Sequence, residues 1–148
     1  GFSKIEIGKA EKLIDGEDIA ILAIGSMVNY AEKAVTMLKE NGINCELINM
    51  RFIKPLDYQM LDEISLKHEK IVTIEENNLP GGFGSAVLEY FNDKNYKNDF
   101  LRIGIPDKFI DHGTQSELHK QISIDPAGIV SQITTFFRST KSTEKVTY

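Results

Sequence analysis

A glycine-rich run suggests the first chemistry to consider, the binding of an anion. Gly81, Gly82 and Gly84 lead into a predicted helix, and Ser85 follows them. Glycines at a helix start expose backbone N–H groups that can hold a phosphate. The run lacks the lysine of a Walker loop and the G-x-G-x-x-G spacing of a dinucleotide site. The structural alternative is close packing of the helix start against a sheet, where glycine avoids a Cβ clash.

The serines and histidines show no pattern of a catalytic or metal site. Ser26, Ser85 and His112 lack the G-x-S-x-G turn that presents a hydrolase nucleophile. His68, His112 and His119 have no metal-ligand spacing with acidic residues on one helix face. We therefore expect no catalytic residue and no metal ligand in this chain.

Charged residues also follow two predicted strands. Glu75 and Glu76 end one strand, and their adjacency should point them to opposite faces of the sheet, which makes them a poor acid/base pair. Arg51 and Lys54 follow another strand and could contact a phosphate, although such residues more often pair with carboxylates across an interface. In an open α/β sheet, ligands and partners gather at the carboxyl ends of the strands.

Helical and strand periods alternate along the chain, which predicts an α/β sandwich with helices on both faces of a mostly parallel sheet. Asp18 to Gly25 is almost continuously apolar and predicts a central strand. Asn29, Asp57 and Asp125 are expected helix caps, and Thr114 with Glu117 has capping-box spacing. The expected strands are 5–14, 18–25, 45–50, 70–76 and 101–105, and helices are expected between and after the last four.

Composition limits the classes of function. The 148 residues carry 17 basic and 22 acidic side chains, a formal charge of −5, with no dense basic run, so nucleic-acid binding is disfavoured. No apolar stretch approaches the roughly 20 residues that cross a bilayer, and we expect a cytoplasmic protein. Cys45 is expected to be a buried core residue. The start at Gly1 suggests a piece of a longer protein, with one domain at 1–137 and a disordered tail at 138–148.

Several motifs carry a resemblance to a known family. The run INMRFIKPLD at 48–57 resembles the D-x-R-x-[IV]-K/R-P-L-D signature of the transketolase C-terminal domain, with Asn49 in place of the usual Asp. HEKIVTIEEN at 68–77, followed by GGFGS at 81–85, is similar to a second pattern of that domain. IPDKFIDHGT at 105–114, with Glu117 and Leu118, closely resembles the corresponding run of 1-deoxy-D-xylulose-5-phosphate synthases.

The resemblance implies a three-layer α/β/α fold. Its five-stranded mixed sheet has the order 1-3-2-4-5, with strand 1 antiparallel to the others. The turn signal at Asp15-Gly16 would by itself predict a hairpin that pairs strand 1 with strand 2. The two expectations conflict, and we follow the family order.

The resemblance also implies a function for a longer parent protein. Such enzymes use thiamine diphosphate and Mg²⁺ to join pyruvate, after loss of CO₂, to glyceraldehyde 3-phosphate, a step that feeds isoprenoid precursors. The groups that hold the cofactor and act on the substrates belong to upstream thiamine- and pyrimidine-binding domains. This chain is expected to bind neither the cofactor nor the substrates. It is expected to support assembly of a homodimeric parent.

The candidate site is therefore an interface rim and not a catalytic centre. It comprises Arg51, Glu76, Asn77, Gly81, Gly82, Gly84 and Ser85. One alternative is a module that docks a protein or regulatory ligand at this rim, as in other transketolases or 2-oxo acid dehydrogenase β-subunits. A free-standing nucleotide-binding domain is weaker, because no ribose-binding acid lies about 20 residues beyond the glycines.

Overall fold

Five strands form one sheet in the order β1-β3-β2-β4-β5. The computed structural model describes residues 4–78, 81–105, 117, 119–120 and 124–139, and only the backbone at 77, 78 and 105. The strands are β1 Glu11–Ile14, β2 Ile19–Ala23, β3 Cys45–Asn49, β4 Lys70–Asn78 and β5 Asp99–Ile105. The helices are α1 Met27–Glu40, α2 Tyr58–Lys67, α3 Phe83–Asp93 and α5 Pro126–Arg138, and Glu117, His119 and Lys120 also have helical backbone.

The topology confirms the family order and shows that the hairpin expectation was wrong. β1 pairs antiparallel with β3, whereas β2 pairs in parallel with both β3 and β4. Gly16 lies against the backbone of Cys45 and Glu46, where a Cβ would overlap the Cys45 carbonyl. At Gly16 the chain therefore crosses the start of β3, so that β1 and β2 pair with opposite sides of β3. The first strand is also shorter than expected, because residues 5–10 run outside the sheet.

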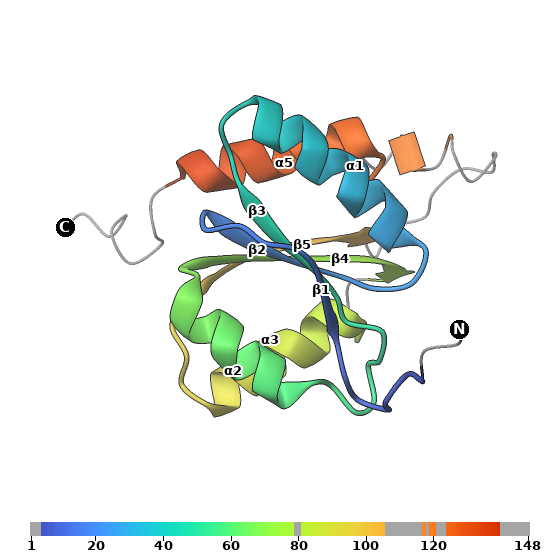
Figure 1. The fold of residues 1–148 in the computed structure, drawn as a ribbon, viewed down its shortest axis with the longest axis vertical. Coiled ribbons are helices and arrows are strands. Elements are labelled where there is room, and N and C mark those ends of the chain that lie inside the picture. Colours follow the sequence, from blue (N-terminus) through green and yellow to red (C-terminus); the bar gives the residue numbers. More distant parts are fainter. Residues whose placement is uncertain (1–3, 79–80, 106–116, 118, 121–123, 140–148) are drawn as a thin grey trace.

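The sheet lies between two layers of helices (Figure 1). Helices α1 and α5 cover one face, and α2 and α3 cover the other. All five residues of β2 are fully buried, as the apolar run predicted, because both faces of this central strand are covered. Alternate residues of β2 thus join two separate apolar cores, one on each side of the sheet.

Two of the predicted helix caps are confirmed. Asp57 accepts a hydrogen bond from the Met60 N–H (3.1 Å), and Asp125 accepts one from Gly128 (3.0 Å). The Asn29 cap was wrong, because α1 already begins at Met27. Gly25 adopts a left-handed conformation (φ 63°) that turns the chain directly into this helix. The capping box at Thr114 lies outside the described residues.

The end of α5 lies one residue beyond the expected domain boundary, at Arg138. Residues 140–148, which make up most of the expected tail, lie outside the described part of the chain. The division of the chain at residue 137 stays a prediction. In the described ranges, no helix is both long and apolar enough to span a membrane.

Candidate functional site

The candidate rim lies at the carboxyl edge of the sheet, where β2, β3, β4 and β5 end. The chain leaves β2 toward β3 on one side, and β4 pairs on the other side of β2. The strand order therefore reverses between β2 and β4, the position at which open α/β sheets hold ligands and partners. Ser26 follows β2, and Glu76 lies near the end of β4, so both residues lie at this point.

Glu75 occupies the anion position that the glycine run suggested. Its carboxylate accepts hydrogen bonds from the backbone N–H groups of Phe83 (2.8 Å) and Gly84 (2.6 Å) at the start of α3. Burial raises the pKa of Glu75, although these two hydrogen bonds and the nearby charge of Arg102 act in the opposite direction. The helix start therefore already holds an internal carboxylate, which caps α3 from the neighbouring strand.

The glycine at position 84 is explained by packing. A Cβ there would lie 2.7 Å from Thr73 Oγ1 and 3.0 Å from a Glu75 carboxylate oxygen. The Ser85 hydroxyl accepts a hydrogen bond from Arg102 Nη2 (2.6 Å) and another from the Gly81 N–H (3.2 Å). The structure thus supports the packing interpretation of the glycine run, and Ser85 serves the internal structure of the loop.

Glu76 points to the other face of the sheet, as the alternation predicted. Ser26 Oγ donates a hydrogen bond to one carboxylate oxygen, and His119 Nε2 lies 3.1 Å from the other. His119 Nδ1 lies 3.2 Å from the Tyr30 hydroxyl, and the two rings meet edge to face. This Glu76 cluster joins the end of β4 to the start of α1 and to the helical residues around His119.

The Glu76 cluster is not a nucleophile-base arrangement. The hydroxyl of Ser26 faces a carboxylate, and the imidazole of His119 contacts Glu76 and Tyr30. A serine nucleophile needs an imidazole positioned to take its proton. Ser85 lies on the opposite face with Arg102, and His112 is outside the described residues. Sequence reasoning missed Tyr30 and His119 as members of the rim, because no spacing links them to Glu76.

Arg51 lies apart from both groups, at the end of β3. It adopts a left-handed conformation (φ 61°), its N–H donates to Asn49 Oδ1 (3.1 Å), and its guanidinium forms an ion pair with Glu11 of β1. Asn49, which replaces the usual family Asp, therefore stabilises this turn. The carboxylate partner of Arg51 lies within the domain, so the pair is not itself a contact across an interface.

The residues of the predicted rim thus lie along one edge of the sheet, in three separate groups. Arg51 lies beside β1, Glu76 faces α1, and the 81–85 run lies at the start of α3. Asn77 belongs to β4, and only its backbone is described. Among the described residues, no group of three or more His, Cys, Asp or Glu could hold a metal ion.

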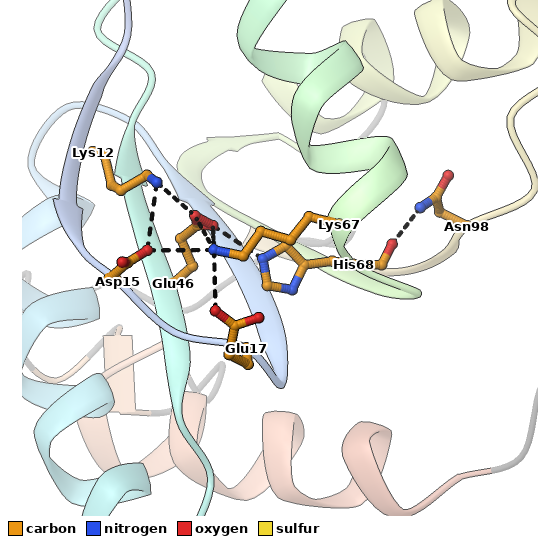
Figure 2. Close-up of polar contacts among 7 residues, drawn as sticks. All are labelled: Lys12, Asp15, Glu17, Glu46, Lys67, His68 and Asn98. Atoms are coloured by element: carbon orange, nitrogen blue, oxygen red, sulfur yellow. Dashed lines mark hydrogen bonds and ion pairs between the residues drawn. The ribbon is translucent and has the colours of Figure 1, made fainter.

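A second polar cluster, which sequence reasoning missed, lies at the opposite, amino edge of the sheet (Figure 2). Its centre is Glu46 of β3, whose side chain is only 1% exposed. His68 Nε2 lies 3.0 Å from one carboxylate oxygen, and Lys67 Nζ lies 3.2 Å from the other. Lys12 reaches the same carboxylate at 3.3 Å. We call these four residues the Glu46 cluster.

The Glu46 cluster holds a buried charge by surrounding it with donors. Burial raises the pKa of the Glu46 carboxyl, but hydrogen bonds from His68, Lys67 and Lys12 outweigh burial and leave the pKa below its ordinary value. Asp15 and Glu17 lie around Lys67 at the solvent side. His68, the first residue of the second motif, therefore has a structural role as the buried partner of Glu46.

Comparison with known proteins places this geometry in a family. The model of the transketolase C-terminal domain matches residues 8–129. The chain is 46% identical over 132 residues to 1-deoxy-D-xylulose-5-phosphate synthase of Cytophaga hutchinsonii, covering 89% of this chain and 21% of that protein. The Caldanaerobacter subterraneus enzyme of the same name is 46% identical over 127 residues, covering 86% of this chain and 20% of the relative. The chain spans about a fifth of the length of these curated relatives.

Solved structures give the same answer. A chain described as a split-gene transketolase, an inactive beta4 tetramer, superposes with a TM-score of 0.83 at 29% identity, over 90% of this chain and 43% of that one. A transketolase mutant from Pichia stipitis, at 17% identity and a TM-score of 0.61, shares the fold, over 88% of this chain and 18% of its own length. The sheet order, the two motifs around Arg51 and Glu75, and these matches show that the chain belongs to the transketolase C-terminal domain family.

Proposed function

We propose that this chain is the assembly domain of a thiamine-diphosphate-dependent transferase that makes 1-deoxy-D-xylulose 5-phosphate and CO₂ from pyruvate and glyceraldehyde 3-phosphate. The observation that carries the proposal is the 46% identity to synthases of that name along nearly the whole domain. The domain covers only a fifth of those relatives, so the catalytic groups are assigned to the remaining four fifths. The cytoplasmic location expected from the sequence stays a prediction.

The cofactor does not fit the one helix start that resembled an anion site. The N–H groups of Phe83 and Gly84, which would have to hold a diphosphate, already donate to Glu75. A phosphate there would also lie against a buried carboxylate, and two like charges in a buried place repel strongly. We therefore assign thiamine diphosphate and Mg²⁺ to upstream thiamine- and pyrimidine-binding domains, and this chain to their support.

The role that remains is assembly of a homodimeric parent. The structural neighbour that is described as an inactive beta4 tetramer supports this role, since a chain containing this fold there forms an assembly without activity. The rim residues Arg51, Glu76 and Ser85 all have partners inside the domain, so their contribution would be to hold the shape of the edge. This shape is what a neighbouring domain or subunit would contact.

The proposal is tested in a chimera. The C-terminal domain of the Cytophaga hutchinsonii enzyme is replaced by this chain, and formation of 1-deoxy-D-xylulose 5-phosphate is measured with sedimentation on the same preparation. We expect an active, assembled chimera. Arg51→Ala removes the ion pair with Glu11 that helps to hold the shape of the edge, so it should weaken the assembly by up to about 1 kcal/mol, and turnover per assembled enzyme should barely change.

The matched control is Arg138→Ala, which removes an exposed arginine at the last turn of α5, near the amino edge. It should change neither assembly nor turnover. A fully assembled Arg51→Ala chimera whose turnover falls about a hundredfold, the loss expected for a removed transition-state donor, would show that this domain acts in catalysis.

The isolated 148-residue chain gives a second test. It should not convert pyruvate and glyceraldehyde 3-phosphate, and titration calorimetry with thiamine diphosphate and Mg²⁺ should show no binding. A dissociation constant on the order of 1 μM, corresponding to about −8 kcal/mol, would contradict the assignment of the cofactor to other domains.

A further inference from the structure

The segment that leads into β1 lies along the loop between β3 and α2. The Ala10 N–H donates to Asp57 Oδ2 (2.8 Å), and a Cβ on Gly8 would lie 2.9 Å from Pro55 Cγ. Both segments are seen together near the N-terminal end in Figure 1. Within this fixed segment, Ile5 is 57% exposed and Ile7 is 78% exposed. Two large apolar side chains are therefore exposed on a segment that is anchored to the domain at Gly8 and Ala10.

A groove of about 250 Å³ is lined in part by the same loop. Ile53, Leu56, Tyr58, Ala86 and Tyr90 line it, together with the charged residues Lys54, Glu89 and Asp93. Ile53 and Lys54 directly precede Pro55, which Gly8 contacts, so the groove begins beside the segment that carries the exposed isoleucines. We call Ile5, Ile7, Ile53 and Tyr58 the arm surface.

The groove is rigid on its aromatic side. The rings of Tyr58 and Tyr90 are in contact, tilted by 40° with centroids 4.7 Å apart, and the Tyr90 hydroxyl donates to Asp62 (2.7 Å). Asp62 also accepts a hydrogen bond from Tyr96 (2.8 Å), which fixes it in turn. Tyr58 is nevertheless 48% exposed. A pre-ordered tyrosine beside apolar side chains, with charged residues around it, has the composition of the centre and rim of a protein interface.

We propose that the arm surface is the docking site of the protein domain that precedes this one in a parent of the family. This inference rests on the proposed function. The matched family is named for its C-terminal position, and the domain makes up about a fifth of the relatives, so in them the other four fifths precede it. Residues 4–10 are the route by which such a domain is connected, which keeps it at high effective concentration beside this surface.

The occupant should present an apolar patch with a basic side chain at its edge. The apolar part follows from Ile5, Ile7 and the groove floor, because burying exposed apolar surface favours association. The basic part follows from the charged groups that line the groove, because the two acidic residues Glu89 and Asp93 outnumber the single basic residue Lys54. A second copy of this chain would bring the same acidic pair to the contact and fits less well.

Thiol labelling of the chimera tests the inference. Ile7→Cys is made in the 148-residue chain and in the chimera with the Cytophaga hutchinsonii enzyme, and the labelling rate at position 7 is read by peptide mass spectrometry. Leu66→Cys is the matched control, because Leu66 is 89% exposed at the end of α2, near the amino edge. We expect labelling at position 7 to be at least about tenfold slower in the chimera, and labelling at position 66 to be equal in both proteins.

A second substitution tests the groove. Tyr58→Glu, added to Ile7→Cys in the chimera, should restore fast labelling at position 7, because it places an unpaired charge in the contact. Leu66→Glu should not. An active, assembled chimera with equally fast labelling at position 7 in both proteins would overturn the docking surface alone. A chimera that neither assembles nor turns over would count against the proposed function, and the docking inference would fall with it.

Discussion

The two edges of the sheet carry the same kinds of polar residue in opposite states. At the amino edge, the Glu46 carboxylate is 1% exposed and is held by a histidine and two lysines. At the carboxyl edge, Glu76 is 32% exposed, and its partners include Ser26 and His119. Each cluster joins segments that are distant in sequence. The charged carboxylate of the amino edge is buried, whereas that of the carboxyl edge is partly exposed to solvent.

The difference separates stability from recognition. A buried carboxylate with several donors is costly to disturb, because its partners would remain in the interior. A partly exposed carboxylate can exchange a partner for water or for a group on another protein at little cost. The Glu46 cluster should therefore matter for folding, and the carboxyl edge for whatever meets the domain.

The largest effect is expected for the thiol of Cys45, which lies next to Glu46 in β3 and should be protected from labelling reagents in the folded chain. Burial, with a smaller contribution from Asp18, raises the pKa of Cys45 to about 12, and its residue is 1% exposed. Since the thiolate is the reactive form, labelling at pH 8 should be at least about a thousandfold slower in the native chain than in urea, equivalent to about 4 kcal/mol of opening. Equal rates in the two conditions would mean that the amino edge is open.

Removal of the Glu46 side chain should destabilise the domain more than removal of Glu76. Glu46→Ala leaves the buried His68 without its partner, and we expect a loss of about 3 kcal/mol in the free energy of unfolding. Glu76→Ala should cost about 1 kcal/mol, because water can reach the space that it leaves. Urea unfolding at pH 7 compares the two variants. Equal losses would remove the distinction between the edges.

The contribution of Glu46 should depend on pH in a defined direction. Its folded-state pKa is lowered, so its charge stabilises the fold above the unfolded-state value of about 4.3, and this stabilisation disappears as the pH falls through the folded-state pKa. Glu46→Gln should cost about 2 kcal/mol at pH 7, the value of a charged hydrogen bond, and progressively less below about pH 4.

Glu75 also titrates in this pH series, but in the opposite direction. Burial raises its pKa, so any stability linked to its protonated form is present at low pH and lost as the pH rises through the folded-state value. Glu75 is present in both proteins, so its effect cancels in their difference. A gap between the original chain and Glu46→Gln that stays constant from pH 7 to pH 3 would contradict a lowered pKa at Glu46.

Local patterns predicted the elements of the fold better than their arrangement. The apolar run of β2 and the caps at Asp57 and Asp125 could be found because each depends on neighbours in the sequence. The pairing of β1 with β3 could not, because the Asp15-Gly16 turn favours a hairpin locally, and the family motifs alone indicated the order. Contacts between distant segments override a short turn signal.

The candidate site shows the same limit. Alternation in β4 correctly separated Glu75 from Glu76, since successive strand residues face opposite sides. The glycine run could be recognised, but the carboxylate that fills its helix start lies eight residues earlier along the chain, on the adjacent strand. Glu46 gave no signal at all, because a single charged residue in a short strand looks like a solvent-facing position.

The smallest effect is expected at Arg51, and it completes the contrast between the edges. The Arg51–Glu11 pair links β3 to β1 at the carboxyl edge, and about half of the Glu11 side chain is exposed (48%). Solvent screens such a pair, so Arg51→Ala in the 148-residue chain should lower the free energy of unfolding by less than about 1 kcal/mol. Urea unfolding at two salt concentrations measures this, and the small loss should shrink at high salt. A loss as large as that of Glu46→Ala, unchanged by salt, would mean that Arg51 belongs to the folding core. Its expected effect on assembly of the chimera would then follow from local unfolding, and the carboxyl edge could no longer be regarded as a surface kept for recognition.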